Sequence, residues 1–232
     1  MKPLARKLII GVAVLAIGAV AGPWVYINLI KEDAPEALKL EPSAATTIVE
    51  ETVESTVQAS AVDGTWAIAT DSIVGYRVKE VIVAQSTEGV GRTSAVQGTL
   101  NIAGEQVTEA QFSVDMTTLK SDSSRRDGQV NNRILDTATY PTATFTLKQP
   151  ITLTPEALAG SDLTTQATGT LTLRGVTKDI ELTLIARLAN DVIEVNGSIE
   201  IIFAEWSIPD PSISAIVVED RGQLEFLLRF TR

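Results

Sequence analysis

The sequence predicts an all-β domain of about eight antiparallel strands, preceded by one transmembrane helix and a flexible stalk. From Trp66 onward, apolar and polar residues alternate in several short runs, which is the pattern of half-buried strands. Turn sequences such as Arg174-Gly175 and Asn190-Asp191 separate these runs. This number and spacing of strands is typical of a barrel or a sandwich whose neighbouring strands run antiparallel.

The composition excludes several classes of protein. The chain has 232 residues, which suits one domain with extensions. Its formal net charge of −10 argues against a nucleic-acid partner, because phosphate binding needs a concentrated basic surface. It contains no cysteine and no histidine, which removes thiolate chemistry, histidine-dependent catalysis and nearly all zinc sites. We therefore predict a protein that is not an enzyme and has no metal site.

Residues 1–30 are predicted to anchor the chain in a membrane. Residues 8–30 carry no charge and, as a helix, would span roughly 34 Å, enough to cross the hydrocarbon core. Basic residues precede this run, so we expect a single-pass cell-membrane protein with a cytoplasmic N-terminus and an extracytoplasmic barrel domain. These residues are Lys2, Arg6 and Lys7, while Trp24 and Tyr26 would lie near the outer interface.

A cleaved signal peptide is the alternative for the same segment. Ala19-Val20-Ala21 has the small-x-small form of a cleavage site, which would give a secreted protein. The apolar run continues past this site to Ile30, which favours the anchor.

The rest of the chain divides into a stalk and a domain. Residues 31–62 are acidic and contain no aromatic residue, so they are predicted to form a disordered stalk. Residues 63–232 form the predicted barrel domain.

The apolar faces of the predicted strands are candidates for the inner wall. An eight-stranded barrel is either filled by its side chains or leaves room for one small ligand. Small residues at Ala110, Ala143, Gly169 and Ala186 would leave room or face larger partners. Alternation alone does not identify the inward face, so the choice of lining residues depends on their apolar character. The candidates are Tyr76, Val78, Phe112, Val114, Phe145, Leu171, Leu173, Leu182 and Phe226.

Residues 121–139 interrupt the alternation. They hold three arginines that could clamp an anion, because guanidinium groups suit carboxylates and phosphates. The alternative is a short helix, capped at residues 121–123, whose apolar edge at Val130 and Ile134 packs on the barrel. The local sequence favours the helix.

Residues 204–221 form the second interruption. Glu205 and Asp210 are a carboxylate pair that could act as acid and base. No strand pattern holds them together, so we expect solvated loop acids instead. Asn196-Gly197-Ser198 matches the N-glycosylation signal, but it lies within a strand pattern and is expected to have no such role.

Four motifs follow one another along residues 63–232. They are WAI at 66–68 with DSIVGYRV at 71–78; VQGTL at 96–100; Arg126-Asp127 with Leu135-Asp136 and YPTATF at 140–145; and GTLTLRGVTK at 169–178. Together they resemble the YceI-like family of exported polyisoprenoid-binding proteins.

The resemblance implies an eight-stranded, lipocalin-like barrel with an isoprenoid-type lipid in its interior. An isoprenoid lipid or a quinone is the expected ligand, and no other cofactor is expected. Arg126 and Trp206 are candidates for contact with the polar head group at the mouth. The expected partners are this lipid and the membrane, reached through the N-terminal helix, with a homodimer as a further candidate. The alternative is a solidly packed structural or stress-related interaction domain without lipid.

Overall fold

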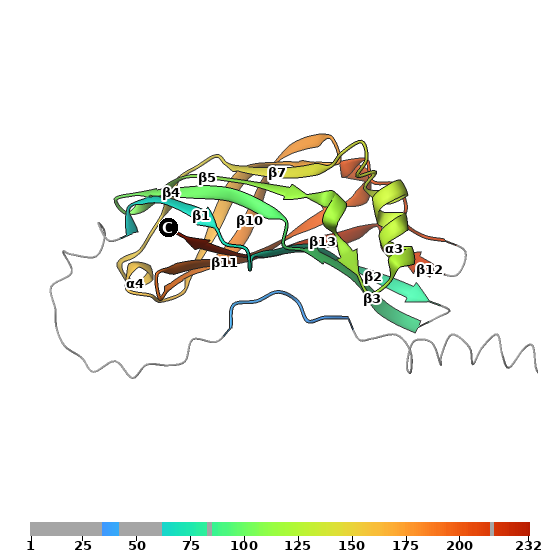
Figure 1. The fold of residues 1–232 in the computed structure, drawn as a ribbon, viewed down its shortest axis with the longest axis horizontal. Coiled ribbons are helices and arrows are strands. Elements are labelled where there is room, and N and C mark those ends of the chain that lie inside the picture. The colour runs from blue at the N-terminus through green and yellow to red at the C-terminus, as the bar shows by residue number, and fades with distance from the viewer. Residues whose placement is uncertain (1–33, 42–61, 83–84, 214–215) are drawn as a thin grey trace, which may run out of the picture.

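The fold is an antiparallel barrel whose ends carry short helices (Figure 1). The computed structural model describes residues 34–41, 62–82, 85–213 and 216–232. Within these residues, eight strands close into a ring in the order β1-β4-β5-β7-β9-β10-β11-β13, and β13 pairs again with β1. The ring strands are β1 (Gly64–Ile68), β4 (Val96–Ala103), β5 (Gln106–Asp115), β7 (Thr142–Leu147), β9 (Leu163–Leu173), β10 (Val176–Ala189), β11 (Val192–Ile202) and β13 (Arg221–Thr231).

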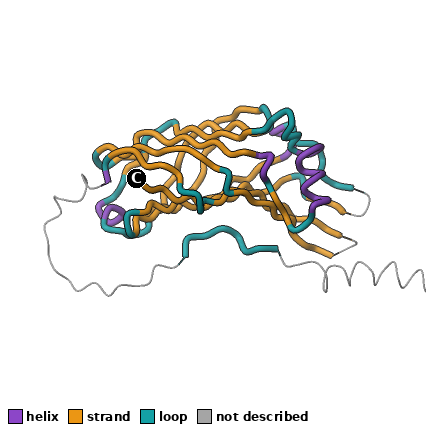
Figure 2. Tube along the Cα trace, in the orientation of Figure 1, coloured by secondary structure: helices purple, strands orange, loops and turns teal. Residues whose placement is uncertain are grey.

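Further strands extend the wall at one end. β2 (Ile73–Ile82) pairs with the first half of β13, whereas β1 pairs with its last residues. β3 (Gln85–Thr93) pairs with β2, and the short strands β6 (Lys120–Ser121) and β12 (Ile216–Val218) pair with β3 and β2. At the other end, β8 (Ile151–Thr152) pairs with β5, next to helix α4 (Pro155–Leu158). Figure 2 shows strands along the whole body and helices at its two ends.

The helix predicted within residues 121–139 is confirmed. Helix α3 (Ser124–Gln129) continues into a π-helical turn, η3 (Val130–Ile134). The Ser123 hydroxyl caps it by accepting a hydrogen bond from the backbone N–H of Arg126. The side chain of Val130 is buried, as the apolar edge predicted. Two further helical turns are η2 (Met116–Thr118) and η4 (Phe203–Trp206).

Strand β3 was not expected from the sequence. Its residues, QSTEGVGRT, are polar and rich in glycine, so they show no apolar alternation. The structure explains these glycines. A side chain at Gly91 would collide with the ring of Tyr76, and one at Gly89 would press on Arg126. The sequence of this strand therefore reflects close packing against β2 and α3, and it has no apolar alternation of its own.

The predicted membrane anchor lies outside the described residues, as does most of the predicted stalk. In the described part of the chain, no helix has the length and apolar character needed to cross a membrane. Residues 34–41, from within the predicted stalk, lie along the outer wall of the barrel (Figure 1).

Candidate functional site

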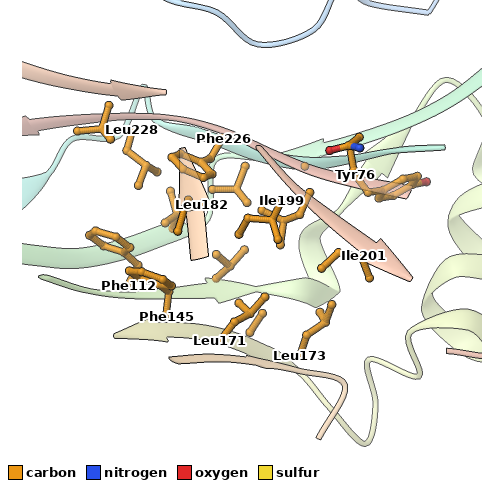
Figure 3. Close-up of a pocket in the computed structure, with 18 of the residues that line it drawn as sticks. Tyr76, Phe112, Phe145, Leu171, Leu173, Leu182, Ile199, Ile201, Phe226 and Leu228 are labelled. Carbon is orange, nitrogen blue, oxygen red and sulfur yellow. The ribbon is translucent and has the colours of Figure 1, made fainter. Parts of the chain in front are cut away.

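The barrel encloses a cavity of about 570 Å³. This volume lies within the range of roughly 300–1,000 Å³ that is typical of small-molecule sites. Because side chains alternate between the two faces of a strand, the apolar faces of seven of the eight ring strands, all except β1, point into this space. All nine residues predicted to face the interior line the cavity, and Figure 3 shows several of them converging on it. Their role in lipid binding remains a prediction.

One end of the cavity is aromatic and closely packed. The rings of Phe112 and Phe145 stack with centroids 5.8 Å apart, and Phe230 packs against Phe112 at 5.7 Å. Phe112 and Phe145 are cross-strand partners on the neighbouring strands β5 and β7, whereas Phe230 comes from β13. This end offers only apolar contacts from these rings.

The small residues predicted on the inner face serve two purposes. Ala110, Ala143 and Ala186 line the cavity and leave space in it. Gly169 instead accommodates a neighbour, because a side chain there would collide with the ring of Phe145. Both alternatives left open by the sequence therefore occur.

Tyr76 places a polar atom in this apolar lining. Its hydroxyl is buried, and among the described residues no hydrogen-bond partner reaches it. Burial raises the pKa of Tyr76 well above its usual value, so the hydroxyl keeps its proton at physiological pH. In Figure 3, Tyr76 lies at the opposite end of the cavity from Phe112 and Phe145. A buried donor without a partner is costly, so this atom is suited to a ligand that accepts a hydrogen bond.

Arg126 lies beside this end of the cavity, but its charge is already compensated. Its guanidinium donates to Glu80 Oε1 at 2.8 Å and also pairs with Asp122. Glu80 projects from β2, is 5% exposed and lines the cavity with Arg126. Since two carboxylates face one guanidinium, the group does not provide a free cation for an anion. The anion clamp considered for residues 121–139 is therefore not supported at Arg126.

The cavity reaches the surface beside α3. Arg125 and Gln129 of α3, and Ile213 opposite them, line the cavity and are exposed to solvent. We call this end the mouth. Arg133 ties the helical segment to the facing loop by donating to the carbonyls of Asp210 and Pro211, each at 2.9 Å.

Trp206 does not line the cavity. It is 3% exposed and packs in an apolar cluster with Leu173 and Ile208, while Lys178 lies over its ring. The arrangement gives no support to contact between Trp206 and a head group.

The other sequence candidates have structural partners of their own. Glu205 pairs with Lys178 at 2.8 Å, and Asp210 accepts from the backbone N–H of Ser212 at 2.8 Å. Hydrogen bonds from Ser212 lower the pKa of Asp210, which does not suit a general acid. The Asn196 amide donates to the carbonyls of Leu38 and Phe226, so it is engaged within the fold. Across the described ranges, no group of three or more acidic residues could hold a metal ion.

Glu80 is the site residue that the sequence reasoning missed. It lies in phase with Val74, Tyr76 and Val78 on β2, so alternation alone places it on the inner face. A carboxylate on the inner face of a strand indicates that a basic side chain pairs with it there. The sequence did not identify that side chain, because Arg126 is 46 residues away.

Comparison with known proteins identifies the family. A model of the YceI-like domain matches residues 46–230. The chain belongs to the YceI-like family. The resemblance found in the four sequence motifs is confirmed. A comparison with curated protein sequences finds no match.

Two solved structures illustrate the similarity. A polyisoprenoid-binding domain from Saccharophagus degradans is 22% identical in sequence and has a TM-score of 0.58. The alignment covers 72% of this chain and 98% of that domain's chain. BcnA from Burkholderia cenocepacia has 18% identity and a TM-score of 0.52, with coverages of 67% and 95%. At these identities the similarity establishes the fold.

Proposed function

We propose that this YceI-like protein binds one isoprenoid-type lipid in its barrel and carries it at the outer face of a cell membrane. The observation that carries the proposal is the cavity of about 570 Å³ with an apolar wall and a single buried, unpartnered hydroxyl at its mouth end among the described residues. An apolar chain in this space gains about 0.8 kcal/mol for each buried methylene. Few polar groups are needed to orient such a ligand.

The head group is proposed to be neutral and to accept a hydrogen bond from Tyr76. A quinone carbonyl or a prenol oxygen meets this requirement. A phosphate would lie near Glu80 and Asp122, whose charges Arg126 alone does not outweigh. The polarity of the mouth therefore favours a neutral head over an anionic one.

The relatives and the sequence support the remaining parts of the proposal. The similar domain from Saccharophagus degradans is described as polyisoprenoid-binding, and it shares this fold. The uncharged run at residues 8–30, with basic residues before it, supports a single-pass anchor and export of the barrel. No step in binding or carriage requires a catalytic residue.

Lipid analysis of the purified full chain tests the proposal. Native mass spectrometry and solvent extraction should recover one long-chain lipid for each chain, and the emptied protein should take up an added polyprenyl quinone. A protein that is empty as purified and takes up no polyprenyl lipid would contradict the proposal. It would instead favour the structural or interaction domain.

A further inference from the structure

Residues 34–41, which we call the strap, are bound to the outside of the barrel by their backbone. Arg77 donates to the carbonyl of Pro35 at 2.7 Å, and Arg92 donates to that of Glu36. Asn196 donates to Leu38 at 3.0 Å, and Arg187 donates to Glu41 at 2.7 Å. All four acceptors are main-chain carbonyls, so these bonds determine the path of the strap along the wall.

The first half of the strap lies on an ionic cluster that is built into the wall. Glu225 of β13 is 4% exposed and pairs with Arg77 at 3.2 Å and Arg92 at 2.8 Å. The absence of a side chain at Gly75 lets Arg92 cross β2, since any side chain there would collide with it. The same two arginines that neutralise Glu225 bind the strap. Strap binding therefore uses side chains that the barrel already holds in place.

The strap has a defined direction relative to the mouth. Its first residue, Ala34, borders a small hollow with Lys120, Ser121 and Asp122, directly before helix α3. Its last residue, Glu41, lies at Arg187, towards the end of the barrel that carries α4. Figure 1 shows the strap running from the β2–β3 end towards the α4 end. The chain therefore reaches the barrel at its mouth end.

The anchor in the proposed function ends close to this point. Only residues 31–33 separate Ile30 from Ala34, and four peptide steps reach at most about 14 Å. If the strap held the opposite direction, the α4 end would be the one near the membrane. The observed direction brings the mouth to the bilayer from which a lipid would come.

The rim of the mouth also carries the exposed apolar side chains. Val81, Ile213 and Val217 are the large hydrophobic residues exposed in the described part of the chain, and Val217 is 63% exposed. Val81 and Val217 face each other across the β2–β12 pair. Their neighbours Ile82 and Ile216 line the cavity, so Val81 and Val217 project from the outer face of the same strand pair, at the rim of the mouth. Ile213 both lines the cavity and is exposed.

We propose that the strap holds the barrel with its mouth on the bilayer, and that Val81, Ile213 and Val217 contact the lipid surface. This inference rests on the anchor of the proposed function. A patch of three residues binds lipid weakly by itself, but a tether of a few residues raises its effective concentration at the membrane. The contact is apolar rather than electrostatic, since the chain has a net charge of −10 and would be repelled by anionic lipid.

Site-specific quenching tests the orientation in the full chain. The sequence has no cysteine, so Val217→Cys and Glu105→Cys each give one labelling site. Glu105 is exposed in the β4–β5 turn, where its carbonyl bonds to Leu153 near α4, and it serves as the matched control. In phosphatidylcholine vesicles that contain brominated lipid, we expect several-fold stronger quenching of a fluorophore at position 217 than at position 105. Equal quenching, or stronger quenching at 105, would overturn the proposal.

Replacing the strap tests its part in the orientation. In a chain with residues 34–41 changed to a glycine-serine sequence of equal length, the difference between the two labels should disappear. A difference that persists would show that the strap does not orient the barrel. Vesicle flotation of the same samples tests the anchor separately. A chain that does not float with the vesicles contradicts both the anchor and the orientation that rests on it. Lipid binding in the barrel is tested independently, because that assay uses no vesicles.

Discussion

At the scale of single residues, the proposed preference for a neutral head group depends on Tyr76. Its ring belongs to the apolar wall, while its hydroxyl is buried without a partner among the described residues. Proteins rarely leave such a donor unsatisfied, because its desolvation is not compensated. A bound acceptor would supply the missing hydrogen bond.

Tyr76→Phe should therefore weaken the binding of ligands whose head group accepts a hydrogen bond. For a polyprenyl quinone we expect a loss of affinity of about tenfold, as for one hydrogen bond worth roughly 1.4 kcal/mol. A hydrocarbon of similar chain length should bind the variant and the parent equally. Competition in a fluorescence displacement assay measures both. Equal loss for the two ligands would mean that Tyr76 acts only through packing.

Tyr76 also predicts a dependence of stability on alkaline pH. Its pKa is raised in the folded chain by burial, whereas the unfolded chain has the ordinary value of about 10. Above that pH the unfolded state loses the proton first, so stability is full below pH 10 and falls as the pH rises. Ionisation of this group lowers the free energy of unfolding by at most about 1.4 kcal/mol per pH unit. Urea unfolding at pH 8 and pH 11 should show a smaller decline for Tyr76→Phe; an identical decline would contradict the assignment.

At the scale of secondary-structure elements, helix α3 is held to the barrel by a buried ion pair. Arg126 reaches Glu80 of β2 and so links the mouth helix to the inner face of the wall. Ser123 and Asp127 stabilise the start of the helix, since Asp127 accepts from the backbone N–H of Ser121 at 2.8 Å. The segment that first suggested an anion site is thus a capped element that borders the mouth.

Arg126→Ala should destabilise the fold more than it affects the ligand. Removing the guanidinium leaves the buried Glu80 carboxylate without this partner, which typically costs about 3–5 kcal/mol. Arg125→Ala, at an exposed neighbouring position, should change stability by less than about 0.5 kcal/mol. Denaturant unfolding measures both. If the folded fraction of Arg126→Ala takes up lipid normally, Arg126 is a structural residue; loss of uptake would make it a head-group contact.

At the scale of the whole molecule, the cavity is the feature that separates a carrier from a solidly packed barrel. Its lining comes from seven of the eight ring strands and from β2, so no short segment creates the space. The volume depends on small residues at a few inward positions, Ala186 on β10 among them.

Filling the cavity should abolish uptake and leave folding intact. Ala186→Phe places a ring in free space, whereas Thr183→Phe places the same ring on the exposed face of β10. We expect native mass spectrometry to show lipid on the Thr183→Phe chain and little on the Ala186→Phe chain. Equal occupancy would show that the lipid does not use this part of the interior.

The strand pattern made much of this structure predictable. The alternation in residues 224–230 placed Leu224, Phe226, Leu228 and Phe230 on one face, and the structure lines the cavity with all four. The cap and apolar edge of α3 were likewise local signals. Strand β3 was not predicted because its sequence has no apolar alternation. Its glycines make room for Tyr76 and Arg126, which lie on other elements.

By itself, the sequence determined which residues share a strand face, the mouth helix and the family, because alternation, capping and motifs are properties of neighbouring residues. The membrane anchor stays a prediction from the sequence. The tertiary structure decided that the barrel is hollow, that the Tyr76 hydroxyl has no hydrogen-bond partner among the described residues and that Arg126 is already paired. It also decided the direction of the strap along the wall. These features depend on contacts between residues far apart in the chain, and such contacts exist only once the ring has closed.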